Sequence, residues 1–304
     1  MLAIVSACGS AAVDQKGTSP SAAPSDSGGT VAYKAANGEV QMPKNPKRIV
    51  VLADSYVGDF LALGIKPVGV SSTALENPYF KGKTDGIESI GDTKSVEKIL
   101  ELKPDLIITF NGIDYLDQLA KVAPTVAIDY GKKTFKEQLL EFGKITNRVD
   151  QANAWIASWD KKIAEAKPKV EAAVGSKTVS ILNPYAKGIY AFGHNYGRGG
   201  EIIYGEFQLK APQMVQKEAI DSGKGWANLS LESLPDFAGD IIFTCPWSGD
   251  TSDPEVVYGN SIWKGLPAVA NKRVYQLEPK GAYYNDPVSL EAQLAFIVEK
   301  LTQG

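Results

Sequence analysis

Two kinds of hydrophobic pattern alternate along the chain. Short runs of apolar, mostly β-branched residues predict strands that are buried on both faces, and stretches with helical periodicity lie between them. The predicted strands cover residues 48–52, 67–70, 105–110 and 125–128 in the first half, and residues 177–182, 188–192, 240–244 and 273–277 in the second. This alternation predicts an α/β fold in which each half forms a doubly wound, parallel sheet.

A long helical stripe separates the two halves. Thr134 and Glu137 have the spacing of a capping box, which predicts a helix that runs toward Asn147. The next apolar stripe covers residues 150–173, and its 24 helical residues would span about 36 Å. Such a helix could cover one domain, but we favour a strut that joins a lobe at 39–149 to a lobe at 174–304. Pro168 is expected to kink or restart it.

Three more helices are predicted in the second half, over residues 200–207, 254–263 and 287–302. The last of them has the clearest start signal. Asp286 stands at a favourable N-cap position, and Pro287 follows at the first helical position, where its missing N–H would have had no partner.

The N-terminus has the character of an export and anchoring segment. Residues 1–7 are mainly apolar, and Val5-Ser6-Ala7-Cys8 resembles the bacterial lipobox, whose cysteine is acylated. Residues 9–30 are almost entirely small or polar, so they cannot bury enough surface to fold. We therefore interpret residues 8–38 as a lipidated, flexible tether. The folded part is expected on the outer face of the cytoplasmic membrane.

The two halves share a short repeated pattern. Glu97 and Asp105 in the first half match Glu232 and Asp240 in the second, with apolar residues at the same offsets between them. This repeat predicts that each lobe exposes one glutamate in the first turn of a helix, near the positive end of the helix dipole.

Composition excludes several classes of function. The chain has 304 residues and a net charge of −3, so it lacks the positive excess of a nucleic-acid binder. One histidine, His194, and two cysteines cannot form a typical zinc site. If Cys8 is acylated, Cys245 has no disulfide partner, and its apolar strand predicts a buried thiol. The chain also lacks a nucleophile elbow and a dinucleotide fingerprint, which argues against an enzyme.

The tether, the two lobes, the connecting helix and the paired glutamates together resemble the substrate-binding proteins of ABC importers for iron-siderophores, haem and vitamin B12. The resemblance covers about residues 39–304 and is greatest toward the ferric hydroxamate-binding lipoproteins of Gram-positive bacteria. It implies a monomer that delivers its ligand to a permease dimer. It also implies that Glu97 and Glu232 contact basic residues on the permease, and that iron enters only within the siderophore, with no metal ligand or cofactor from the protein.

The resemblance also implies where the ligand binds. Residues 190–201 look like the ligand loop of the hydroxamate binders, and residues 283–287 look like an aromatic turn beside it. The candidate ligand-binding residues are Arg198, Tyr196, Tyr190, Trp247, Tyr283, Tyr284, Tyr56 and Tyr130. His194 is expected to be a polar loop residue, because a siderophore already fills the coordination shell of its iron.

The chemistry of these side chains suits a hydroxamate. A ferric trishydroxamate is neutral and amphipathic, so it suits aromatic walls with one or two donors, such as Arg198. Gly197 and Gly199 are expected to free the backbone and let the ligand approach closely. A ferric triscatecholate carries three negative charges and would need a basic cluster, for which Lys132-Lys133 is the only adjacent lysine pair near a predicted strand end. A catecholate or citrate siderophore, haem and cobalamin remain alternative ligands.

Overall fold

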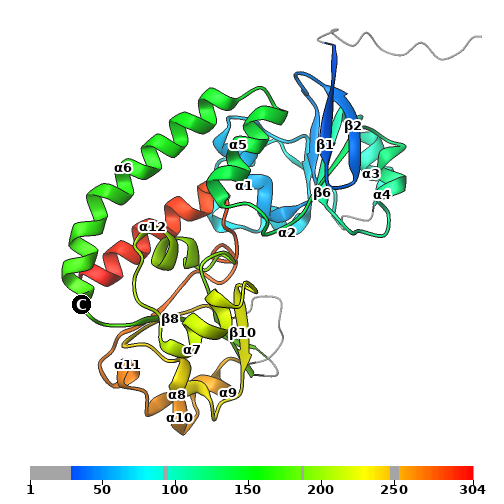
Figure 1. The fold of residues 1–304 in the computed structure, drawn as a ribbon. Coiled ribbons are helices and arrows are strands. Elements are labelled where there is room, and N and C mark those ends of the chain that lie inside the picture. The colour runs from blue at the N-terminus through cyan, green and yellow to red at the C-terminus, as the bar shows by residue number, and fades with distance from the viewer. Residues whose placement is uncertain (1–28, 92–94, 186–187, 247–252, 304) are drawn as a thin grey trace, which may run out of the picture.

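The computed structural model describes residues 29–91, 95–185, 188–246 and 253–303, which form two α/β lobes (Figure 1). Cys8 and Trp247 lie outside the described residues. The strands are β1 (Thr30–Ala35), β2 (Gly38–Pro43), β3 (Ile49–Val51), β4 (Gly69–Val70), β5 (Glu88–Ser89), β6 (Leu106–Phe110), β7 (Thr125–Ile128), β8 (Val179–Tyr185), β9 (Gly188–Phe192), β10 (Trp226–Leu229), β11 (Ile241–Thr244) and β12 (Val274–Gln276).

The α-helices are α1 (Val57–Ala62), α2 (Ser72–Leu75), α3 (Val96–Glu101), α4 (Leu116–Ala120), α5 (Phe135–Ile145), α6 (Val149–Val174), α7 (Gln213–Val215), α8 (Leu234–Phe237), α9 (Glu255–Tyr258), α10 (Ser261–Lys264), α11 (Pro267–Ala270) and α12 (Pro287–Thr302). Two 3-10 turns, η1 (Asp54–Tyr56) and η2 (Pro78–Phe80), and two π-helical segments, η3 (Glu201–Glu206) and η4 (Gln216–Asp221), complete the set. Among the described residues, no helix is long and apolar enough to span a bilayer.

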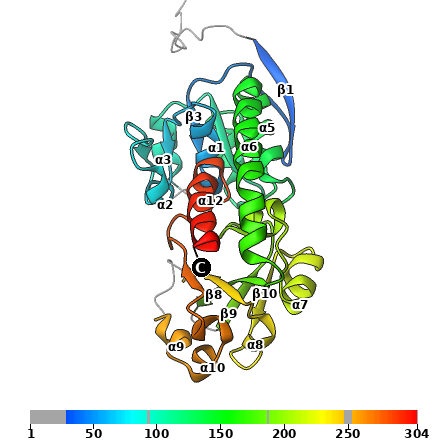
Figure 2. The same cartoon turned by 90° about the vertical axis from the view of Figure 1, so that its left-hand side faces the viewer.

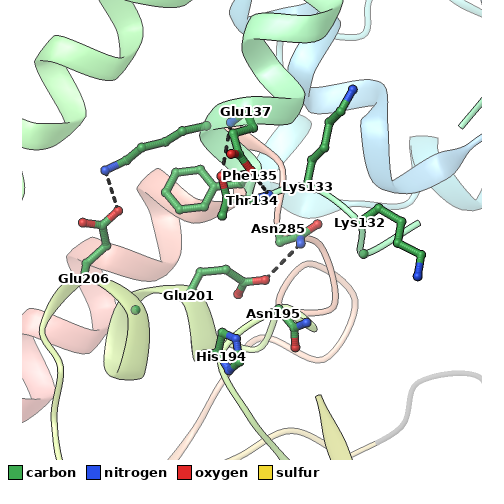
Figure 3. Close-up of a pocket in the computed structure, with 13 residues that line it drawn as sticks. Lys132, Lys133, Thr134, Phe135, Glu137, His194, Asn195, Glu201, Glu206 and Asn285 are labelled. Carbon is green, nitrogen blue, oxygen red and sulfur yellow. Dashed lines mark hydrogen bonds and ion pairs between the residues drawn. The ribbon is translucent and has the colours of Figure 1, made fainter. Parts of the chain in front are cut away.

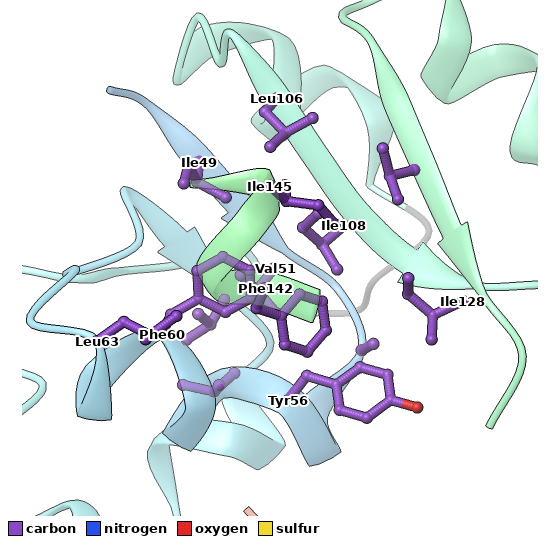
Figure 4. Close-up of a cluster of buried hydrophobic side chains, with 14 of the residues drawn as sticks. Ile49, Val51, Tyr56, Phe60, Leu63, Leu106, Ile108, Ile128, Phe142 and Ile145 are labelled. Atoms are coloured by element: carbon purple, nitrogen blue, oxygen red, sulfur yellow. The ribbon is translucent and has the colours of Figure 1, made fainter. Parts of the chain in front are cut away.

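The N-terminal lobe contains the predicted parallel sheet, with strand order β5-β4-β3-β6-β7. Its core lies between the sheet and helices α1 and α5. Phe60 and Phe142 pack there with ring centroids 4.9 Å apart, and both are fully buried (Figure 4). Burial of these rings and of the β-branched strand residues supplies the main stabilisation of the lobe.

The predicted tether is too long at its C-terminal end. Strands β1 and β2 form an antiparallel hairpin that begins at Thr30, and Asn37 at its turn bonds to the edge strand β7 through the Thr125 carbonyl at 3.0 Å. The sequence carries two signals for this hairpin: the alternation of Val31, Tyr33 and Ala35, and the Asn37-Gly38 dipeptide. The small, polar composition of the preceding residues obscured both.

The C-terminal lobe contains a mixed sheet with strand order β10-β9-β8-β11-β12. Strands β8, β11 and β12 are parallel, as predicted, whereas β9 and β10 run antiparallel to their neighbours. The expectation of an all-parallel second sheet was therefore wrong at this edge, because only two residues separate β8 from β9 in the sequence, too few for a crossover helix. The predicted helix over 254–263 is also two short helices, α9 and α10.

The chain passes between the lobes through α6, which confirms the predicted strut (Figures 1 and 2). Its apolar stripe is buried, with Trp159 fully enclosed and stacked on Trp155 at 5.3 Å. The helix continues through Pro168 without restarting. The capping box of Thr134 and Glu137 is present at the start of α5, as predicted.

The C-terminal helix α12 forms a second bridge. It lies beside α6 and contacts α1 of the N-terminal lobe (Figure 2). At its start Asp286 accepts hydrogen bonds from the Ser289 N–H at 3.0 Å and hydroxyl at 2.6 Å, and Ser289 Oγ accepts one from Asn77 at 3.0 Å. All three side chains are buried, so a closed polar network fastens α12 to the N-terminal lobe.

The sequence repeat corresponds to equivalent positions in the two sheets. Asp105 directly precedes β6 and accepts hydrogen bonds from the backbone N–H groups of Lys47 and Arg48, next to β3. Asp240 directly precedes β11 and likewise accepts bonds from the N–H and hydroxyl of Thr178, next to β8. In each lobe the aspartate therefore fixes the register of two neighbouring parallel strands.

Candidate functional site

Aromatic rings from both lobes meet between the sheets. Tyr130, which follows β7, and Tyr196, which follows β9, have ring centroids 5.7 Å apart. Phe110 lies 5.7 Å from Tyr130, and Tyr56 lies behind both. We call Tyr56, Phe110, Tyr130 and Tyr196 the interlobe aromatic cluster. It lies where strand ends of the two lobes meet, a usual place for ligands in α/β folds.

Arg198 lies next to this cluster and is enclosed by aromatic rings. Its guanidinium carbon lies 3.9 Å from the ring centroid of Phe192 and 4.3 Å from that of Tyr283, and Nη1 donates to the Tyr196 carbonyl at 2.7 Å. Only 6% of the residue is exposed, and burial lowers the pKa of the guanidinium below its ordinary value. These contacts hold the planar donor group in one orientation.

The glycines beside Arg198 give the backbone the unusual angles that were predicted. Gly197, Arg198 and Gly199 all have positive φ, between 57° and 80°. A Cβ on Gly197 would lie 2.1 Å from the Tyr283 carbonyl oxygen, and one on Gly199 would lie 2.5 Å from Ile297. The glycines therefore also allow the loop to pack against the 282–283 segment and α12, and their predicted role in a close approach of the ligand stays a prediction.

Sequence reasoning missed Glu201, which connects the two segments that were predicted to bind the ligand. Its Oε1 accepts a hydrogen bond from the Gly197 N–H at 3.0 Å and another from Asn285 Nδ2 at 2.9 Å. The residue is 5% exposed, Oε2 has no partner among the described residues, and burial raises the pKa of the carboxyl. The sequence places Glu201 directly after Gly199-Gly200 at the predicted helix start, but it does not predict the hydrogen bond from Asn285.

A second aromatic group lies at the edge of the C-terminal sheet. Tyr190 stacks on Tyr185 at 4.2 Å and meets Trp226 edge-on at 5.4 Å. Trp226 is 36% exposed on β10, a strand that was not predicted. This group adds apolar surface near Phe192, whose ring lies 6.0 Å from that of Tyr190.

The remaining candidates are placed in different surroundings. The Tyr283 ring packs against the guanidinium of Arg198, and its hydroxyl donates a hydrogen bond to the Pro246 carbonyl at 3.0 Å. Tyr284 is buried and stacks on Phe80 of the N-terminal lobe at 6.5 Å, and Tyr56 is a buried member of that lobe's core. Tyr56 and Tyr284 thus serve packing within and between the lobes, and their predicted contact with a ligand stays a prediction.

A polar cavity of about 420 Å³ adjoins the cluster and is lined from both lobes (Figure 3). It is lined by Gly131, Lys132, Lys133, Thr134, Phe135, Lys136, Glu137, His194, Asn195, Glu201, Gly205, Glu206 and Asn285. The lysine pair noted in the sequence is therefore at the junction of the lobes. Three glutamates line the same cavity, so it is not the basic cluster that a triply negative ligand would need.

The two repeated glutamates are exposed on different lobes. Glu97 lies in the first turn of α3, as predicted. Glu232 lies in a turn before α8, so its expected place inside the helix was wrong; Pro235 at the second position of α8 shows why the helix starts late. A hydrogen bond with Ser230 lowers the pKa of Glu232.

Neither cysteine chemistry nor a metal centre is evident in the part of the chain that the structure describes. Cys245 is a buried free thiol, as predicted, and burial raises its pKa to about 12. No group of three or more metal-ligating side chains occurs among the described residues.

Comparisons with known proteins agree with this geometry. Residues 49–280 match the model of the periplasmic binding protein family. The chain is 50% identical, over its whole length and 95% of the relative, to the iron(3+)-hydroxamate-binding protein FhuD of Bacillus subtilis. A solved FhuD-fold component of a ferrichrome ABC transporter from the same species has a TM-score of 0.84 and 52% identity, covering 90% of this chain and 100% of that one.

A third relative was solved with a ligand. FhuD2 from Staphylococcus aureus with bound ferrioxamine B has a TM-score of 0.78 and 34% identity, and the match covers 85% of this chain and 99% of that one. The family match extends over most of the chain and the relatives are covered almost completely. The chain therefore belongs to the periplasmic binding protein family.

Proposed function

We propose that the protein captures a ferric siderophore of the hydroxamate type between its two lobes and delivers it to an ABC permease. The observation that carries this proposal is the buried Arg198 beside an aromatic surface contributed by both lobes. A neutral ferric trishydroxamate offers apolar edges to the rings and oxygens to a guanidinium. The hydroxamate and ferrioxamine ligands named for the similar proteins support the same class.

A catecholate or citrate siderophore is less well matched. Of the lysines in the polar cavity, Lys133 lies 3.3 Å from Glu141, and Lys136 lies 2.8 Å from Glu206. These ion pairs leave little free positive charge for a triply negative complex. The iron in this proposal is cargo held by the siderophore, and the protein acts as a binding protein without catalysis.

Delivery would use the outer face of the cytoplasmic membrane. Acylation of Cys8 would anchor the chain there, and the exposed Glu97 and Glu232 would meet basic residues on the two permease subunits. The protein would act as a monomer, since each lobe supplies one of the two contacts.

Quenching of tryptophan fluorescence tests the ligand class. The purified protein would be titrated with a ferric trishydroxamate, a ferric triscatecholate, haem and cobalamin. We expect saturable quenching with the trishydroxamate at the lowest concentration. Tighter binding of any of the other three would overturn the assignment of ligand class.

A further inference from the structure

Two buried side-chain oxygens on residues that line the polar cavity, Glu201 Oε2 and Asn195 Oδ1, have no hydrogen-bond partner among the described residues. Glu201 lines the cavity (Figure 3), and its Oε2 has no hydrogen-bond partner among the described residues. The other oxygen, Oε1, is already used by the Gly197 N–H and Asn285. A buried acceptor without a donor is costly, so a bound molecule that offers a hydrogen to Oε2 would be stabilised.

Most of the other charges around the cavity are already engaged. Lys136 pairs with Glu206 at 2.8 Å and with Asp160 at 2.6 Å. Lys133 pairs with Glu141 at 3.3 Å, and Glu137 caps the start of α5. Because their charges are already paired or used in capping, Lys133, Lys136 and Glu137 contribute to the electrostatic potential of the cavity but are not available as partners for a ligand.

Lys132 is different, because it is exposed and forms no ion pair with any residue that the structure describes. The cavity therefore offers a buried acceptor at Glu201 and an exposed donor at Lys132. A cation would be attracted by Glu201 but repelled by the exposed Lys132, and an anion would meet the buried carboxyl. An uncharged amide satisfies both groups, since its N–H can donate to Glu201 and its carbonyl can accept from Lys132.

The cavity also adjoins the interlobe aromatic cluster along the chain. Gly131 directly follows Tyr130, and Asn195 directly precedes Tyr196, and both line the cavity. We propose that the polar cavity binds an uncharged, amide-bearing part of the siderophore while the metal chelate lies against Tyr130 and Tyr196. This inference rests on the proposed function and adds a basis for choosing among hydroxamates.

Two ligands that differ by a single group provide the test. Ferrioxamine B is a linear trishydroxamate that ends in a primary ammonium, and N-acetylation converts this end into a neutral amide. We expect the unmodified protein to bind the acetylated ferric complex about threefold more tightly or better, because Lys132 repels the ammonium end and donates to the amide that replaces it.

Three variants assign the preference to the cavity. Lys132→Ala should bring the ratio of the two affinities close to one, and Glu201→Gln should weaken binding of the acetylated complex about tenfold, because an amide NH₂ replaces the acceptor Oε2. Lys121→Ala, which removes an exposed lysine elsewhere on the N-terminal lobe, should leave the ratio unchanged. Should Glu201→Gln disturb the loop, the exposed Lys132 variant still decides the question.

The possible results are distinct. Equal affinity of the unmodified protein for the two complexes, or a ratio that Lys132→Ala does not change, would overturn the cavity proposal and leave the proposed function standing. Failure of the unmodified protein to bind either complex would overturn the cavity proposal, and failure to bind ferrichrome as well would overturn the proposed function.

Discussion

Tyr130 and Tyr196 meet edge to face across the two lobes, with ring centroids 5.7 Å apart and planes inclined at 74°. Each residue lies just beyond a strand of its own lobe. A ligand that lies against the interlobe aromatic cluster would rest on this pair or separate it. The pair is therefore a direct probe of where the siderophore binds.

Tyr196→Ala should weaken binding of a ferric trishydroxamate by about 1–2 kcal/mol, or roughly five- to thirtyfold, through loss of aromatic contact area. The matched control is Tyr115→Ala, which removes a half-buried tyrosine on the N-terminal lobe outside the cluster. Fluorescence titration would measure both. Equal affinities of the two variants would show that the ligand does not rest on Tyr196.

The joint between α1 and α12 depends on a glycine. A Cβ on Gly58 would lie 1.6 Å from Asp286 Oδ1, so Gly58→Ala must displace the N-cap of α12. We expect a loss of about 1–3 kcal/mol in stability, measured by thermal unfolding. The control Gly205→Ala meets nothing within 4 Å and should be neutral or slightly stabilising. If both variants unfold at the same temperature, the joint is not a tight contact.

Two buried carboxyl groups at this joint predict a pH dependence. Burial raises the pKa of Asp286 to about 6, and burial together with the charge of Asp286 raises that of Asp59. The folded state therefore holds protons that the unfolded chain releases near pH 4, so their stabilising effect is lost as pH rises through about 6. The melting temperature should fall between about pH 5 and pH 8.

Asp59→Asn isolates this effect, because the amide cannot ionise and is close in shape to the protonated acid. Groups with lowered pKa, such as Glu141 and Asp240, are ionised throughout this range and contribute no slope. The variant should lose less stability than the unmodified protein between about pH 5 and pH 8. Parallel melting curves for the two proteins would contradict the buried-pair account.

Much of the fold was predictable from the sequence because buried parallel strands and long amphipathic helices have strong local signatures. All eight predicted strands are present, and α12 has the predicted bounds. Besides the β1–β2 hairpin, strands β5 and β10 were missed, because β5 has only two residues and β10 exposes Trp226 at a sheet edge, so neither has an apolar run. Their pairing depends on neighbours that are distant in sequence, which local patterns do not contain.

The candidate site was predictable only in part, because it also depends on contacts between residues that are distant in sequence. The position of Arg198 between Phe192 and Tyr283 requires two segments that are 91 residues apart to meet. Resemblance to a family suggested Tyr190, Tyr196, Arg198 and Tyr283 as binding residues, and this remains a prediction. Glu201 was missed because a buried carboxyl is recognised by its partners, which only the fold brings together.

Delivery can be separated from binding by charge reversal. Glu97→Lys combined with Glu232→Lys should leave ligand affinity within a few-fold but reduce siderophore uptake in cells, since attraction to basic permease sites becomes repulsion. The matched control is Glu165→Lys with Glu171→Lys, which makes the same charge change on the exposed face of α6. Normal uptake with the first pair would mean that the two glutamates do not dock the permease.

The central claim is that Arg198 presents its guanidinium to the oxygens of a ferric hydroxamate. The most direct measurement is the affinity of Arg198→Ala for a ferric trishydroxamate, with thermal unfolding to verify that the variant is folded. We predict a loss of about 1.5–3 kcal/mol, roughly 10- to 150-fold, and partial recovery in Arg198→Lys, which keeps the charge but loses the forked geometry. Unchanged affinity in a folded Arg198→Ala variant would contradict the account.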